Sequence, residues 1–249
     1  MDSDFTLEAY SRHLRVAREC GYEFVLLESL LSTRTVPQRV VAIRHDVDYS
    51  LSHARILALA EREQDVVSTY CVFDRSPYYS IGSKESIEAV EKILGRGHGL
   101  GLHFDATEVK SDGDVVEMVA AAAEGLERLF GVEVRVVSFH MPGRRPVGQI
   151  KLSGGRINTY SPPFFDEVKY VSDSNQNWRG VDLEALLRSQ EHHKLQLLIH
   201  PIWWQSCHGT MLERLRVIAR DLCVPLSELL TAEQLQRLPR DEADKVTKG

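Results

Sequence analysis

Long apolar runs and paired cysteines are both missing from this sequence. No segment approaches the roughly 18 consecutive apolar residues that cross a bilayer as a helix, so we expect no membrane span. The four cysteines include no CxxC pair. Neither a disulfide framework nor a thiolate zinc site is therefore indicated.

An excess of basic residues is also lacking. Lys and Arg number 30 against 36 Asp and Glu, and the net charge of -6 gives no basic footprint for nucleic acid. The first ten residues, MDSDFTLEAY, are acidic and polar, unlike a secretion signal. We therefore expect a cytoplasmic protein with no nucleic-acid partner.

What the sequence does contain is an alternation of strand and helix patterns. We expect one domain over residues 1–249, with an N-terminal helical extension at 1–36 and a polar tail at 237–249. Apolar spacing predicts helices over 6–19, 51–63, 83–94, 114–130, 182–190 and 210–222, and strands over 40–43, 66–73, 98–104, 132–139, 168–172 and 195–199. This order predicts an α/β fold whose parallel strands end on one rim.

Some local details follow from individual residues. Asp114 with Glu117, and Thr210 with Glu213, have the spacing of capping boxes at the starts of two helices. Glycine and proline predict irregular structure over 143–155 and 161–165.

The stretch VVAIRHDVDY, residues 40–49, is unusual because an apolar strand runs into two acids. Residues two apart on a strand point to the same side, so Asp46 and Asp48 are expected to face one small volume. Two carboxylates that close repel each other unless a cation or a shared proton compensates, which indicates a metal site. The alternative is that one acid caps the helix starting near Leu51 and the other is solvated.

Later strands also end in residues that bind metals or transfer protons. They are His103 with Asp105, His140, Asp173 and His200. A lone histidine after a strand is usually structural, but repetition on one rim favours a metal-assisted reaction site.

In order along the chain, HDVD, GHGLGLHFD, SFHMP, VSDSNQNW and LLIHP resemble the motifs of the NodB-homology polysaccharide deacetylases, the family 4 carbohydrate esterases. The resemblance covers roughly residues 40–204. It implies an irregular (β/α)7-type barrel and a divalent metal, usually zinc. It also implies hydrolysis of N-acetyl or O-acetyl groups on sugars.

The resemblance also implies roles for residues. Asp46 takes the place of the catalytic base, and Asp48 and His103 take the places of metal ligands. His200 takes the place of the general acid.

The third and fourth motifs match more loosely. His140 and Pro142 stand in the third motif, and Asp173 and Trp178 in the fourth. We expect Asp173 to orient His200, and Trp178 to offer an aromatic face to a sugar ring or an acyl methyl group.

The sequence departs from the family pattern at two positions. Thr107 stands where the family has a second metal histidine, and His140 stands where it has an arginine that orients the base. A zinc hydrolase uses three protein ligands. His140 is our preferred third ligand because imidazole suits zinc, and Asp105 is the competing candidate.

Several flanking residues have alternative interpretations. Arg44 and His45 are expected to pair with the acids, and His98 to be structural because it points away from His103. Trp203 and Trp204 are candidates for the core or for a sugar platform. Arg144 and Arg145 are either solvated or clamp an anionic substrate such as a uronate or a nucleotide-sugar phosphate.

These observations predict a metal-dependent hydrolase that removes an acyl group from an amino sugar of a glycan or glycan precursor. Asp46 would accept a proton from water, and His200 would protonate the leaving amine. One alternative is a metal hydrolase that opens cyclic amides or ureides. Another is a carbohydrate-binding relative without catalytic activity.

Overall fold

The computed structural model describes residues 4–31 and 39–230, together with Gln234, Leu235, Leu238, Ala243 and Val246. Residues 32–36 of the predicted N-terminal extension and most of the predicted tail at 237–249 lie outside these described residues. No helix among the described residues is long and apolar enough to cross a membrane.

Strands and helices alternate along most of the chain. The strands are β1 (Glu23–Val25), β2 (Val40–Val47), β3 (Thr69–Phe73), β4 (Gly99–Asp105), β5 (Val136–His140), β6 (Ile157–Asn158), β7 (Lys169–Ser172) and β8 (Lys194–Ile199). The α-helices are α1 (Leu7–Glu19), α2 (Leu51–Arg62), α3 (Lys84–Leu94), α4 (Asp112–Phe130), α5 (Pro163–Asp166), α6 (Leu183–Ser189), α7 (Met211–Leu222) and α8 (Leu226–Leu229). Short 3-10 turns cover Leu27–Ser29, Pro142–Arg144 and Pro201–Trp203.

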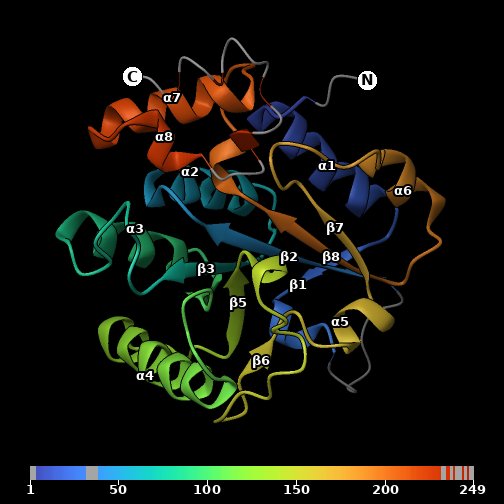
Figure 1. Cartoon of the computed structure of the whole chain (residues 1–249). Helices are drawn as coiled ribbons and strands as arrows, with labels where there is room; N and C mark the ends of the chain where they lie inside the picture. The colour runs from blue at the N-terminus through green and yellow to red at the C-terminus, as the bar shows by residue number, and fades with distance from the viewer. Residues whose placement is uncertain are drawn as a thin grey trace.

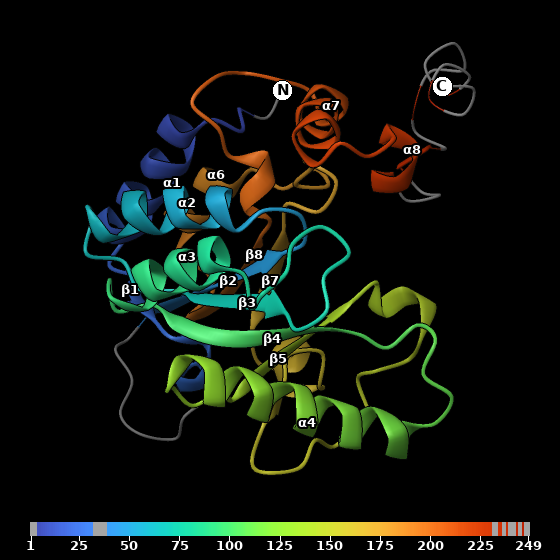
Figure 2. The ribbon, with the colours of Figure 1, turned by 90° about the vertical axis from the view of Figure 1, so that its left-hand side faces the viewer.

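All strand pairs of the sheet are parallel. Their order is β6-β5-β4-β3-β2-β8-β7, and β1 pairs with the first half of β2. The sheet curls into a half-barrel, and among the described strands β6 and β7 are not paired, so the curl stays open there. Figure 1 shows the helices arranged around the strands, with α2 above, α3 to the left and α4 below. In the view of Figure 2, α2 and α3 lie on one side of β3 and β4, and α4 lies on the other. The predicted irregular α/β barrel is confirmed.

The two faces of β2 pack into different clusters of the core. All eight of its residues are buried, because helices cover the outside and the curled sheet encloses the inside. Val41 and Ile43 pack outward in the core that includes α1 and α7, whereas Val40 and Ala42 join an inner cluster.

The inner cluster forms the bottom of the half-barrel. Val40 and Ala42 meet Cys71 of β3 and Val136 of β5 there. At Gly101 of β4, a Cβ atom would lie 2.6 Å from the sulfur of Cys71, so only glycine fits. Because side chains alternate along a strand, the inward positions above this floor include Asp46, and the sequence continues to Asp48 at the rim.

One of the two predicted capping boxes is observed, and one segment expected to be irregular contains a short helix. Thr210 and Glu213 form the predicted capping box of α7. The predicted Asp114 box is wrong: α4 begins at Asp112, with the side chain of Ser111 accepting the Asp114 N–H. The segment at 161–165 was expected to be irregular but contains the start of α5, because proline fits the first turn of a helix.

Candidate metal centre

Six side chains with acid, base or ligand chemistry meet at the open rim of the half-barrel. They are Asp46 in β2 and Asp48 just after it, His103 in β4, His140 in β5, Asp173 just after β7 and His200 just after β8. Parallel pairing brings these strand ends together, because their carboxyl ends share one edge of the sheet. The structure therefore brings together six of the seven residues that the sequence analysis named at the strand ends, and the seventh, Asp105, points elsewhere.

Three of the six form a compact group. One ligand atom each from Asp48, His103 and His140 lies within 4.8 Å of the other two. Asp48 Oδ1 is 3.1 Å from His103 Nε2 and 3.7 Å from His140 Nδ1. The two imidazole rings are perpendicular, and the ring of Phe73 packs against both, with centroids 4.5 and 5.3 Å away. This packing holds the ring orientations.

The donor set fits a divalent cation. Asp48 Oδ1 is buried but accepts no hydrogen bond of good geometry among the described residues, although two imidazole nitrogens lie nearby. The Nδ1 of His103 lies 3.2 Å from Ser138 Oγ, which leaves its Nε2 toward Asp48. Two histidines and one carboxylate are a common ligand set for catalytic zinc.

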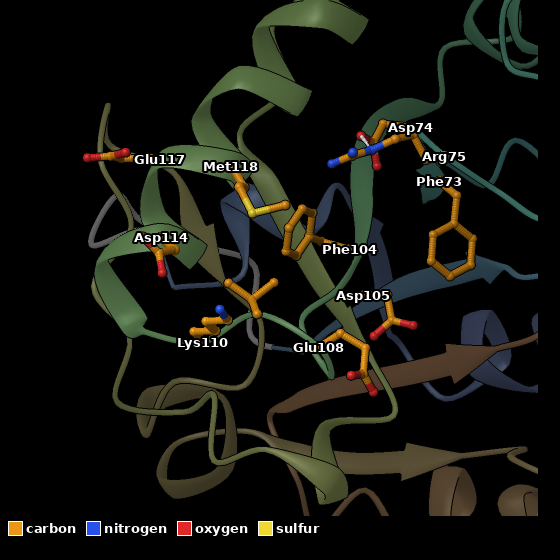
Figure 3. Close-up of a pocket in the computed structure, with 11 residues that line it drawn as sticks. Phe73, Asp74, Arg75, Phe104, Asp105, Glu108, Lys110, Asp114, Glu117 and Met118 are labelled. Carbon is orange, nitrogen blue, oxygen red and sulfur yellow. Dashed lines mark hydrogen bonds and ion pairs between the residues drawn. The ribbon is translucent and has the colours of Figure 1, made fainter.

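Asp105, the competing third ligand, is engaged elsewhere. It is exposed, and its Oδ1 accepts hydrogen bonds from the backbone N–H and the hydroxyl of Thr107, at 2.9 and 2.6 Å. Figure 3 shows Asp105 facing a neighbouring pocket together with Glu108. The geometry thus favours His140 over Asp105, and Thr107 caps the loop.

Asp46 lies deeper, beside the group of three. Its Oδ2 accepts hydrogen bonds from Ser138 Oγ at 2.9 Å and from Arg44 Nη2 at 3.1 Å. Its Oδ1 is buried with no hydrogen-bond partner among the described residues. One oxygen is therefore fixed, while the other is available as an acceptor.

Arg44 is a buried cation two residues before Asp46 on the same face of β2. It is 0% exposed, and its other donors bond to Thr159 Oγ1 at 2.7 Å and to the Tyr160 hydroxyl at 2.9 Å. Burial by itself lowers the pKa of Arg44, but Asp46 more than offsets this, so the pKa is raised and the guanidinium stays charged. The expected pairing of Arg44 with an acid is observed.

His45 points to the opposite face of β2 and pairs with a different acid. Its Nε2 lies 2.7 Å from Glu61 Oε1 of α2. The expectation that His45 pairs with the strand-end acids is therefore wrong, because neighbouring residues on a strand alternate sides. His98 is structural, as expected: its ring bonds to Ser68 and to the carbonyl of Ala58.

Asp173 fixes the position and the ring orientation of His200. Its Oδ1 lies 2.6 Å from His200 Nδ1, both of its oxygens accept the His200 backbone N–H at 3.0 Å, and Oδ2 accepts the indole N–H of Trp204 at 2.8 Å. The other ring nitrogen, Nε2, therefore points toward the group of three, 3.9 Å from Asp48 Oδ2.

The charged groups of the site shift the pKa values of their neighbours. Burial by itself lowers the pKa of His200, but the carboxylate of Asp173 raises it to about 9. Burial by itself raises the pKa of Asp48, yet the neighbouring imidazoles of His103, His140 and His200 hold it well below its usual range. At neutral pH Asp48 is thus a carboxylate and His200 carries a proton.

A pocket of about 480 Å³ opens over these residues. Pro142 of the third motif and Arg144, one of the two candidate clamps for an anionic substrate, line it, and so do Leu198 and Trp203. Trp178 does not line it: its indole is buried against Phe5 and Trp204 in the outer core. Trp203 lies at the pocket in its place.

Some residues of the site were missed by sequence reasoning. Ser138, which contacts both Asp46 and His103, stands two residues before His140, and strand periodicity was the signal that marks it. Arg179 and Tyr160 also line the pocket, but they come from loops with no periodic pattern. No local signal in the sequence indicates their position.

No protein-family model matches the chain. No curated protein matches it in sequence either.

Several solved structures have a similar fold. One is the peptidoglycan deacetylase PdaC from Bacillus subtilis, with a TM-score of 0.47 and 12% identity over 85% of this chain and 92% of that chain. Another is the chitin deacetylase of the fungal pathogen Colletotrichum lindemuthianum, with a TM-score of 0.43 and 13% identity over 73% and 81% of the two chains. A third is BA3943 from Bacillus anthracis, a CE4 family pseudoenzyme, with a TM-score of 0.42 and 14% identity over 77% and 65%.

These structures are family 4 deacetylases or their relatives, the group that the sequence motifs resemble. At such low identity the likeness concerns the fold. The functional proposal therefore rests on the geometry of the site itself.

Proposed function

We propose that this protein is a metal-dependent hydrolase that removes an N-acetyl or other small acyl group from an amino sugar. One observation carries the proposal: three ligand-type residues, a buried carboxylate with one free acceptor oxygen, and a carboxylate-held imidazole converge in a single pocket. Binding alone requires neither a base nor an acid at such positions.

Asp48, His103 and His140 would hold the divalent ion, for which zinc is the choice that this ligand set favours. The ion supplies Lewis acidity, which acidifies water and polarises a carbonyl group. Ser138 and Phe73 keep the histidine rings in place for this role.

Asp46 would accept the proton of the water that attacks the acyl carbon. Its Oδ1 is available, while Arg44 and Ser138 fix Oδ2 and thereby the direction of the carboxylate. A base oriented in this way needs no reorganisation when the water attacks.

His200 would give the proton from Nε2 to the nitrogen of the amide as the C–N bond breaks. The amine then leaves as a neutral group, and the acyl carbon keeps the oxygen from water. Asp173 holds Nδ1 and keeps the imidazole charged until that step.

The proposal is tested by metal analysis and by acetate release from N-acetylated amino sugars. We expect about one zinc ion per chain in the purified protein. Asp46→Asn should keep the metal and lower kcat on the order of 100-fold or more, because the proton acceptor is removed. Asp48→Asn should lose both the metal and the activity.

Asp105→Asn is the matched control, because Asp105 lies on the same rim but outside the group of three. It should keep both metal and activity. A metal-free wild type, or full activity in Asp46→Asn, would contradict the proposal. Turnover of cyclic amides or ureides in place of acyl sugars would assign a different C–N hydrolase, and binding without any turnover would assign a carbohydrate-binding protein.

A further inference from the structure

Two arginines on separate loops face the same pocket. Arg144 ends the 3-10 turn that follows β5, and Arg179 lies in the loop that follows β7. Both are exposed, and both line the pocket together with Asp48, His140 and His200. The curl of the sheet brings these two loops to one opening, although β5 and β7 lie near opposite ends of the strand order.

Neither guanidinium is neutralised locally. Arg144 and Arg179 have no ion-pair or hydrogen-bond partner for their side chains among the described residues. The adjacent Arg145 differs, since it bonds to Asp112 at 2.7 Å and to the carbonyl of Val109. Arg145 is therefore paired within the protein, whereas the neighbouring Arg144 has no partner in the described part of the chain.

Asp46 and Asp48, the acids that line the pocket, are paired with other residues. Asp46 is paired with Arg44, and Asp48 faces three imidazoles. The positive charges of Arg144 and Arg179 thus remain uncompensated inside a chain whose net charge is -6.

The neighbouring pocket has the opposite character. It has a volume of about 560 Å³, and one of its lining residues is Phe73, whose ring also packs on His103 and His140. Figure 3 shows its acidic lining, which comprises Asp74, Asp105, Glu108, Asp114 and Glu117 against only Arg75 and Lys110. Arg75 is paired with Asp74. An anionic group beside the metal centre is thus repelled on the Phe73 side and attracted on the arginine side.

The backbone fixes the loop that carries Arg179. Asn175, Gln176 and Arg179 have left-handed φ angles of 59°, 53° and 53°, which non-glycine residues rarely adopt. Asn177 Oδ1 accepts the Arg179 backbone N–H at 2.6 Å, and Gln176 Nε2 donates to the Gly209 carbonyl at 2.7 Å. Strained residues persist where surrounding contacts over-determine them, often at ligand sites.

We propose that the pocket takes an acylated sugar that carries an anionic group, a phosphate or a carboxylate, and that Arg144 and Arg179 bind this group. The planar guanidinium forms paired hydrogen bonds with both kinds of anion. The inference rests on the proposed deacylation and adds the substrate class. It extends the sequence expectation for Arg144, replacing Arg145 with Arg179 as its partner.

The test compares three substrates of the zinc-loaded protein: neutral N-acetylglucosamine, N-acetylglucosamine 1-phosphate and N-acetylmuramic acid. We expect kcat/KM for at least one anionic substrate to exceed that for the neutral sugar about tenfold or more. Which anion is preferred distinguishes phosphate from carboxylate. In the double variant Arg144→Gln, Arg179→Gln, the ratio of kcat/KM for the anionic substrate to kcat/KM for the neutral sugar should fall toward one.

Arg128→Gln on α4 is the matched control, because it removes the same charge from an exposed position outside the pocket. It should leave the ratio unchanged. Equal kcat/KM for neutral and anionic sugars, or a ratio that survives the double substitution, would overturn the arginine site while leaving the deacylation intact.

A binding measurement separates the two proposals. Calorimetry of N-acetylglucosamine 1-phosphate with zinc-loaded Asp46→Asn should show binding that weakens about tenfold or more when Arg144→Gln and Arg179→Gln are added. If no sugar is deacylated but this loss is seen, the proposed reaction fails and the anion site stands. Affinity that does not change on adding the two substitutions overturns the anion site.

Discussion

The charge of the imidazole that faces the pocket depends on one carboxylate. Asp173 raises the pKa of His200 to about 9 against the effect of burial. The proton that His200 is proposed to donate is present below that pH and lost above it. We therefore expect the alkaline limb of the kcat/KM profile to depend on Asp173. In Asp173→Asn the limb should move to lower pH by about one to three pH units, because an adjacent opposite charge is removed.

The control for this profile is Asp166→Asn, an exposed acid of α5 outside the pocket. Its alkaline limb should coincide with that of the wild type. Thermal unfolding of both variants checks that the Asp173 site still folds. An unchanged limb in a folded Asp173→Asn protein would remove His200 from the role of proton donor.

At the scale of single residues, the sequence allowed prediction of the side chains that stand on strands. His103 and His140 occupy positions fixed by strand periodicity, so their convergence follows from parallel pairing. Trp178 and Arg179 lie in a loop, where no period relates one side chain to the next. The orientation of Trp178 into the core therefore depends on contacts with distant residues such as Phe5, which no local pattern reveals.

Among the elements, α2 is joined to β2 and β3 by one buried carboxylate. Glu61 is 0% exposed and accepts hydrogen bonds from Tyr10 at 2.5 Å and from Ser68 and Tyr70 at 2.7 Å, besides facing His45. Burial by itself raises the pKa of Glu61, but His45 and the hydroxyl donors lower it to about 2. The carboxylate thus ties the outer face of β2 to helices α1 and α2.

This carboxylate gives the fold a specific dependence on acid. Because the pKa of Glu61 falls from an ordinary 4.5 to about 2 on folding, its stabilisation is complete above about pH 4.5 and is lost as the pH falls toward 2. The linked free energy of unfolding is on the order of 3 kcal/mol. In urea titrations across this range, Glu61→Gln should be less stable at neutral pH and should show a flatter pH dependence.

Glu88→Gln, on the exposed face of α3, is the comparison variant. It should retain the acid dependence of the wild type. If Glu61→Gln loses stability with the same pH slope as the wild type, the carboxylate contributes by packing and its ionisation does not matter.

Elements with a clear apolar period were predictable, and the shortest were not. The helices α1, α3 and α7 follow their three- and four-residue spacing and their caps. β6 has only two residues, too few for a period, and it is a strand only because it pairs with β5. Predicted strands such as 132–139 begin late, at Val136, because ladder pairing depends on the neighbouring strand as well as on local apolarity.

For the whole molecule, the proposed metal centre would link β2, β4 and β5 at the rim. A ligand that binds only the folded chain stabilises it by about 4 kcal/mol at a thousandfold excess over Kd. For a chain of this size that corresponds to roughly 10 °C in Tm. We therefore expect a chelator to lower Tm by about this amount, measured by calorimetry, with Asp48→Asn insensitive to the chelator and Asp105→Asn as sensitive as the wild type. A wild type whose Tm ignores chelation would show that no ion joins these strands.

The overall α/β class follows from the alternation of patterns, but the strand order does not. Nothing in the sequence places β8 beside β2, although Val40 pairs with Lys194 and His45 with Ile199, because residues so far apart along the chain are brought together only by the tertiary fold. The pairing of β1 with the first half of β2 is likewise determined by tertiary contacts.

Among the described strands, β6 and β7 are not paired, so the sheet is open between them. The side chains of the proposed ion site stand on or just after strands β2, β4 and β5, which are joined through β3 by backbone hydrogen bonds. Arg144 and Arg179 belong to loops on either side of the opening. Substitutions in these loops are therefore expected to change which sugars the proposed pocket admits, without moving the side chains proposed to carry out the reaction.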